Sequence, residues 1–102
     1  MLQYSREAVS LIHDRTRSDL DSDRVLGLAL VRLIEIVGEA ASRISTATCA
    51  EHPQIPWRDI TNMRNRLIHG YHAVDMEVLW QTLRQDLPPL ITALERILDS
   101  EG

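Results

Sequence analysis

Lysine is absent from this chain of 102 residues, so every basic side chain apart from histidine is an arginine. The formal net charge at pH 7 is −4. A protein that binds nucleic acid broadly normally carries a surplus of basic residues, because phosphate contacts supply most of its affinity. That surplus is missing here. We therefore expect any contact with nucleic acid to be confined to a small part of the surface.

Cysteine and long apolar runs are also scarce. Cys49 is the single cysteine, which excludes an internal disulfide. No apolar stretch follows basic residues at the amino terminus, so we expect no secretory signal. The longest apolar run, Val25 to Val37, contains a glycine, an arginine and a glutamate, and it is too short to cross a membrane. These features predict a protein of the reducing cytoplasm.

The composition, 44% hydrophobic and 25% charged, is that of one globular domain, which we place over residues 1–102. Apolar residues recur at helical spacing and no strand alternation is found, which predicts an all-α bundle of four to five helices. A first helix is predicted from about Leu2 to Arg17. The acidic segment from Ser18 to Asp23 is predicted to form a loop and to cap the next helix.

The second predicted helix, from about Asp23 to Thr46, is the longest and the most apolar. Its apolar side chains follow each other at three- and four-residue spacing: Leu26, Leu30, Leu33, Val37, Ala40 and Ile44. Further apolar residues widen this stripe beyond one face: Leu28, Val31, Ile34 and Ala41. A helix this apolar is either central to its bundle or shared with a second copy of the chain. We interpret it as core and homodimer interface.

The second half of the chain is divided by prolines and one glycine. Residues 49–56 are predicted to form a loop, and a third helix begins near Pro56. Gly70 is a natural stop for that helix. Asp75 is predicted to cap a fourth helix, and Pro88-Pro89 to kink or break it before a last helix, because neither proline donates a backbone hydrogen bond.

The nine residues from Arg64 to His72 hold two guanidinium groups, an amide, two imidazoles and a phenol. Arginine donors match phosphate oxygens, and histidine exchanges protons near neutral pH. Cleavage of RNA without a metal needs these groups: a base for the ribose 2′-proton, a cation for the charge on phosphorus, and an acid for the leaving oxygen. Arg64 and His69 are the candidate catalytic residues on these grounds.

Helix geometry makes one copy of this site incomplete. Arg64 and His69 are five residues apart, so they differ by roughly 140° around the helix axis and about 7.5 Å along it. One histidine per chain supplies an acid or a base, but not both. A two-fold dimer with two such helices side by side brings together two groups of each kind. The spacing therefore favours a homodimer with its cleft at the symmetry axis.

The same residues also have simpler interpretations. Arg64 and Arg66 could be solvated or paired with an acid such as Asp59. His69 beside a glycine could cap the end of its helix, and Tyr71 could donate a hydrogen bond to the backbone at the edge of the core.

No metal or cofactor is predicted. His69 and His72 have the spacing of a ligand pair, but the intervening glycine interrupts the helix and no third ligand is nearby. Cys49 is interpreted as structural or incidental, since no base accompanies it. Trp57 and Trp80 are interpreted first as core anchors, with stacking on RNA as the minor alternative.

The run Ile55-Pro56-Trp57-Arg58-Asp59-Ile60 leads into Met63-Arg64-Asn65-Arg66-Leu67-Ile68-His69-Gly70-Tyr71. It resembles the HepT-type branch of the HEPN superfamily. Two flanking parts are similar to the same branch: the segment from Ile34 to Ala41, and the segments between Val74 and Leu90. The resemblance spans about Val25 to Leu98. Its motif is an arginine, four residues, a histidine, one residue and a tyrosine.

The resemblance implies a dimeric helical bundle, in many members the toxin of a two-gene toxin–antitoxin module. Active members are metal-independent ribonucleases whose arginine and histidine meet across the dimer, which carries over to Arg64 and His69. Asn65 matches the polar residue after the arginine, and with Arg66 and Tyr71 it is a candidate supporting or RNA-binding residue.

The partner implied is a minimal nucleotidyltransferase (MNT) antitoxin, which can transfer AMP to the motif tyrosine, here Tyr71. Added negative charge there would repel substrate phosphate. The alternative function is a non-catalytic, nucleotide-binding or regulatory subunit of such a nucleotidyltransferase, with Arg64 and Arg66 holding a nucleotide phosphate.

Overall fold

The computed structural model describes residues 1–67 and 76–101, apart from the side chains of residues 64–66, 100 and 101. Within these ranges the chain is helical and contains no strand, so the predicted all-α class is confirmed. Four helices of ten residues or more form the bundle: α1 (Leu2–Leu11), α3 (Arg24–Ser42), α5 (Trp57–Leu67) and α7 (Leu87–Glu101). Shorter elements lie between them: α2 (Arg17–Ser22), α4 (Thr46–Glu51), α6 (Met76–Gln81) and the π-helix η1 (Thr82–Asp86).

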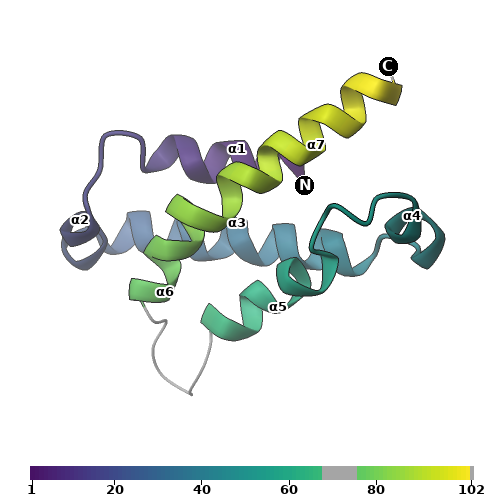
Figure 1. Ribbon diagram of the computed structural model, residues 1–102. Coiled ribbons are helices and arrows are strands. Elements are labelled where there is room, and N and C mark those ends of the chain that lie inside the picture. The colour runs from purple at the N-terminus through teal and green to yellow at the C-terminus, as the bar shows by residue number, and fades with distance from the viewer. Residues whose placement is uncertain (68–75, 102) are drawn as a thin grey trace.

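The helix α3 organises the bundle. It packs against α1 and α5, and α7 packs in turn against α1 (Figure 1). In this view α3 is the most distant helix, and the continuous ribbon that leads from α6 into α7 passes in front of it. The shortest principal extent of the molecule is 17 Å, which accommodates two layers of helices at interaxial distances of about 8–10 Å. Two layers cover α3 on one side only.

The core is built on the apolar stripe of α3. Leu26, Leu30, Leu33 and Val37 are all buried, as their spacing predicts, and Ile34 joins them. The other two members of the predicted stripe, Ala40 and Ile44, are only half-buried, and Ile44 lies beyond the end of α3. Each such side chain contributes roughly 1.5–3 kcal/mol when it is fully removed from water. The residues predicted to widen the stripe differ in their exposure. Ala41 is also buried, whereas Leu28 is 60% exposed. The helix is therefore apolar beyond the area that its own chain covers.

The amino-terminal boundaries correct the sequence-based prediction. The first helix ends at Leu11 rather than Arg17, and the predicted acidic loop is largely the separate helix α2. The backbone N–H of Thr16 donates to the Asp19 carboxylate at 2.7 Å, which caps the start of α2. Leu20 then anchors α2 by being buried. A local cap combined with one buried leucine is enough to form a helix there.

The two ends of α3 show one prediction confirmed and one wrong. Asp23 caps the helix as predicted, its carboxylate accepting from the backbone N–H of Leu26 at 3.0 Å. The helix ends at Ser42, four residues before the predicted end. Ser45 caps α4 instead, accepting from the N–H of Thr48 at 3.1 Å. The predicted loop over 49–56 is therefore helical in its first part.

The proline pair does not interrupt the helical structure, which continues from η1 into α7. Pro88 and Pro89 lie in the first turn of α7, directly after η1. In a continuous α-helix their missing N–H groups would leave two carbonyls of the preceding turn without partners. The chain instead widens into the π-turn of η1, where the Thr82 hydroxyl donates to the Val78 carbonyl at 2.8 Å. The predicted irregularity is thus a widened turn.

Within the described ranges, no helix is both long and apolar enough to span a bilayer.

Two leucines of α7 provide a test of this core. Leu87 is fully buried, whereas Leu98 is 53% exposed. We expect Leu87→Ala to lower the free energy of unfolding by about 2–5 kcal/mol, because it leaves a cavity in the core. Leu98→Ala should change it by no more than about 0.5 kcal/mol. Chemical denaturation of both variants measures the difference, and equal effects would contradict the assigned packing of α7.

Candidate functional site

The helix that carries the first half of the motif starts from a well-anchored turn. Ile55 is buried, and the Trp57 indole N–H donates to the His52 carbonyl at 3.0 Å. The backbone N–H of Trp57 donates to the Ile55 carbonyl at 2.9 Å. The helix α5 then begins at Trp57, which confirms the predicted start beside Pro56.

One face of α5 is fixed on α3. Ile60, Met63 and Leu67 recur at three- and four-residue spacing, and all three are buried on the inward side of α5, a helix that packs against α3. Leu67 is completely inaccessible to solvent. Burial of this face sets the axis and the rotation of α5, and with them the position of the backbone that bears the arginines of the motif.

The predicted site residues divide between two parts of the chain. Arg64, Asn65 and Arg66 belong to the last described turn of α5, as their spacing predicts. His69 and Tyr71 fall in residues 68–75, which lie outside the described residues. The predicted helix stop at Gly70 and cap at Asp75 fall there as well. Those assignments, and the meeting of Arg64 with His69, stay predictions.

The two described flanks of the segment 68–75 are Leu67 and Met76, and the Met76 flank lies on α3. A Cβ on Gly27 would stand 3.5 Å from the Met76 Cε atom, an ordinary van der Waals contact. In α2, the Arg17 guanidinium donates to Glu77 of α6 at 3.1 Å and to Asp21 at 3.0 Å. The hydrogen bonds that Arg17 donates to Asp21 and Glu77 raise the pKa of its guanidinium above the ordinary value. The amino-terminal half of α3, α2 and α6 therefore meet at one end of the bundle.

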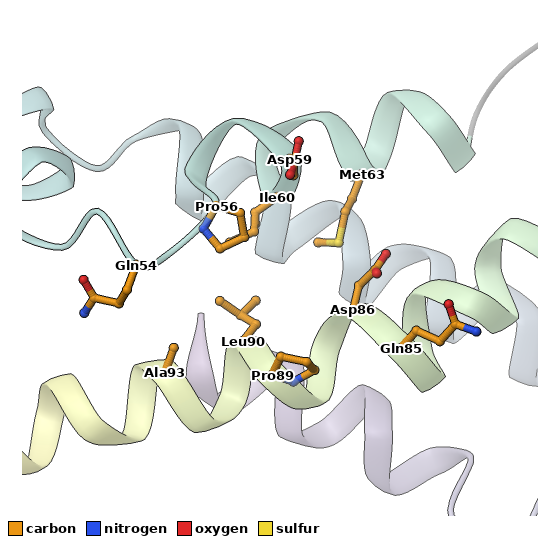
Figure 2. Close-up of a pocket in the computed structure, with 10 residues that line it drawn as sticks. All are labelled: Gln54, Pro56, Asp59, Ile60, Met63, Gln85, Asp86, Pro89, Leu90 and Ala93. Carbon is orange, nitrogen blue, oxygen red and sulfur yellow. The ribbon is translucent and has the colours of Figure 1, made fainter.

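A groove of about 380 Å³ separates α5 from η1 and α7 (Figure 2). Its lining is apolar in the middle and polar toward its ends: Gln54, Pro56, Asp59, Ile60, Met63, Gln85, Asp86, Pro89, Leu90 and Ala93. Figure 2 shows Met63 directed into the groove and Asp86 directed toward α5. The described residues that form this lining include two carboxylates, Asp59 and Asp86, and no arginine or histidine. The π-turn brings Gln85 and Asp86 to the groove, and the sequence pattern did not predict that turn.

Metal ligands do not cluster in the part of the chain that the structure describes, where no group of three or more histidine, cysteine, aspartate or glutamate residues could hold an ion. His69 and His72 lie outside it.

The predicted role of both tryptophans as core anchors is confirmed, because each is half-buried against the core. The Arg84 guanidinium lies 5.5 Å from the centre of the Trp80 ring. The Cys49 Sγ atom lies 4.0 Å from the Ile44 carbonyl oxygen, a weak contact.

Comparison with known proteins extends these observations. The family model described as "Ribonuclease HepT-like" matches residues 1–97. A protein of Thermococcus cleftensis named "Probable ribonuclease HepT" is 40% identical over 100 residues, covering 94% of this chain and 91% of the relative. Two proteins named "Putative RNase" are also similar. The one from Caldanaerobacter subterraneus is 36% identical over 99% of this chain and 90% of its own length. The one from Methanocaldococcus jannaschii is 28% identical over 100% and 85%.

No solved structure was found to match the chain.

An all-helical bundle, a motif helix fixed on its longest helix, and a family match over nearly the whole length agree with one another. This chain belongs to the HepT-like family of the HEPN superfamily. The resemblance read from residues 55–71 and their flanking segments is thereby confirmed.

Proposed function

We propose that this chain is a metal-independent endoribonuclease, the toxin of a HEPN/MNT toxin–antitoxin module, which acts as a homodimer. The observation that carries the proposal is the family match over residues 1–97, which includes the complete motif of Arg64, His69 and Tyr71. The curated relatives named as ribonucleases, at 40% and 36% identity, support it. The anchored helix α5 supports it as well, because catalytic groups need a rigid frame.

In the proposed reaction Arg64 binds the scissile phosphate and stabilises the negative charge that builds on its oxygens. A histidine acting as base takes the proton of the ribose 2′-hydroxyl, whose oxygen then attacks phosphorus. The bond from phosphorus to the 5′-oxygen breaks, and a protonated histidine supplies the proton for that oxygen. The products are a 2′,3′-cyclic phosphate and a free 5′-hydroxyl, so no water or metal enters this step. Asn65 and Arg66 orient the reacting groups.

Two copies of the chain are required by this chemistry. His69 of one copy acts as base or as acid in a given turnover, and the second function falls to the His69 of the other copy. The net charge of −4 supports a small contact with RNA limited to the motif, because the chain as a whole repels phosphate.

The proposed silencing of this activity uses Tyr71. An MNT antitoxin would transfer AMP from ATP to the tyrosine oxygen and release pyrophosphate. The added phosphate stands two residues from His69, where its charge and bulk exclude the phosphate of RNA.

Substitutions at the motif test the proposed reaction. We expect Arg64→Ala and His69→Ala each to lower RNA cleavage about a hundredfold or more, because each removes charge stabilisation or proton transfer. Both should also abolish growth arrest. Arg58→Ala is the matched control, since Arg58 is an exposed arginine of the same helix outside the motif. It should leave cleavage unchanged.

The assay is carried out on purified protein with labelled RNA in the presence of EDTA. Unchanged cleavage by Arg64→Ala and His69→Ala would contradict the proposed function. Cleavage by the natural chain that EDTA abolishes would contradict its independence of metal. A chain that binds ATP and never cleaves RNA would favour the regulatory subunit instead.

Modification of Tyr71 gives a separate test of the proposed partner. After co-expression with an MNT protein, the intact mass of the chain should increase by one AMP group, located on the peptide that contains Tyr71. Tyr71→Phe should show no increase, because it lacks the acceptor oxygen. Mass spectrometry of both proteins measures this. A natural chain of unchanged mass, or equal modification of the variant, would remove this tyrosine from the proposed silencing mechanism.

A further inference from the structure

A small hollow lies where α1 packs against η1 and α7. It has a volume of about 160 Å³. The buried side chains of Ile12 and Leu83 form its floor, and His13 and Arg84 are exposed at its rim. We call the residues that line this hollow the η1 slot: Val9, Ile12, His13, Leu83, Arg84 and Pro88.

The η1 slot carries positive charge beside an apolar floor. The described residues that line it include the guanidinium of Arg84 and no carboxylate. No ion pair joins Arg84 to a carboxylate of the described residues. A neighbouring hollow on α1 differs, because its arginines are already paired: Arg6 with Glu95 at 3.1 Å, and Arg15 with Asp23 at 3.6 Å. A ligand that carries phosphate is therefore favoured at the η1 slot.

The Arg84 guanidinium is supported by an aromatic ring. It lies 5.5 Å from the centre of the Trp80 ring, within the range of a cation–π interaction. The Trp80 ring is half-buried against the core, so it is a fixed support for the guanidinium. Arg84 also belongs to the π-turn of η1, and such turns are rare and recur at functional sites. This turn is a second reason, independent of the charge, to place a binding site here.

The η1 slot lies a short way along the chain from the motif. The segment 68–75, which contains His69 and Tyr71, leads directly into α6, and α6 continues into η1. Arg84 follows Met76 by eight residues, which corresponds to about 12 Å along a helix. Successive phosphates of one strand advance about 3.4 Å along a duplex, and an unpaired strand extends further. A strand bound at this flank of the motif therefore spans the distance within about four nucleotides.

We propose that the η1 slot binds one unpaired base of the RNA substrate, within about four nucleotides of the phosphate that is cleaved. This inference rests on the proposed function, which places the cleaved phosphate at Arg64 and assigns no base to any surface. The base lies on the apolar floor and stacks on the plane of the Arg84 guanidinium. The His13 imidazole N–H donates to a phosphate oxygen of the same nucleotide. The Asp14 carboxylate lies 4.0 Å from this imidazole, but both side chains are highly exposed and the pair is weak.

The size of the η1 slot favours a base of a longer strand over a whole small molecule. Sites for whole small molecules measure about 300–1,000 Å³ and enclose most of the ligand. The 160 Å³ of the η1 slot accommodates part of a ligand, such as one flat ring system. A base that is paired and stacked in an RNA duplex does not reach such a slot, whereas an unpaired base does. The η1 slot therefore favours cleavage of single-stranded RNA.

Binding of an uncleavable RNA tests the η1 slot. The probe is a fluorescent oligoadenylate of about ten nucleotides with every ribose 2′-O-methylated, so the hydroxyl that the proposed reaction needs is absent. Arg84→Ala should raise the Kd for this probe at least about fivefold, because the stacking of one base is lost. Arg84→Lys should behave similarly, since lysine keeps the charge but has no planar group. Arg96→Ala is the matched control, because Arg96 is an exposed arginine of α7 outside the slot, and its Kd should be unchanged. Fluorescence anisotropy measures each Kd.

A second measurement locates the bound base along the strand. A probe with one ordinary ribonucleotide in an otherwise 2′-O-methylated strand can be cleaved at that position alone, which fixes its register. Removing its bases one at a time should raise the KM of the natural chain at least about fivefold at one position. The same removal should leave the KM of Arg84→Ala unchanged, because that variant has no stacking to lose. Base removal that raises the KM of both proteins equally would contradict the proposed stacking.

The outcomes separate the η1 slot from the proposed function. A natural chain that binds no probe, or Arg84→Ala that binds it as tightly as Arg96→Ala does, would overturn the slot. Binding that depends on Arg84, without cleavage of any RNA, keeps the slot and removes the proposed function. Free AMP that binds through Arg84, while RNA binding does not depend on Arg84, assigns the slot to a free nucleotide and overturns the proposal. If circular dichroism shows that Arg84→Ala does not fold, His13→Ala replaces it, and an unchanged Kd would then overturn the slot.

Discussion

The contact between α5 and α3 is the interaction on which the rest of this structure depends. Ile60, Met63 and Leu67 are buried in it, and they hold the helix that carries Arg64, Asn65 and Arg66. The same contact fixes which side of α3 faces inward. The long helix is apolar on more of its surface than this packing uses, so Val25 and Leu28 remain in solvent. The position of the motif helix and the exposure of these two apolar residues thus both depend on how α3 is packed.

Helical periodicity in the sequence was sufficient to predict which faces of the long helices are buried. It placed the core stripe of α3 and the inward face of α5, and the Asp23 cap followed from residue type. The boundaries that it missed depend on side-chain caps worth only about 1 kcal/mol each. Asp19 caps the start of α2, where a loop was predicted, and Ser45 caps the start of α4, where the end of a longer helix and then a loop were predicted. Such small differences are settled by tertiary packing, as the burial of Leu20 shows.

For the candidate site, the sequence predicts a pairing of residues that a single copy of the chain does not bring together. The arginines lie in the motif helix as predicted. The pairing of Arg64 with His69 is not a property of one helix, because their spacing sets them apart on it. The predicted partner is a second copy.

The central claim is that one catalytic site needs both copies of the chain, because the His69 of one copy acts as base and the His69 of the other acts as acid. The direct measurement is RNA cleavage by an equal mixture of natural and His69→Ala chains, unfolded and refolded together so that the copies exchange. About half of the dimers are then mixed, and each mixed dimer lacks one of the two histidines. Only the natural dimers should cleave RNA, so the mixture should have about one quarter of the activity of the same amount of natural chain. About one half of that activity, in a mixture shown by mass spectrometry to contain mixed dimers, would contradict the claim.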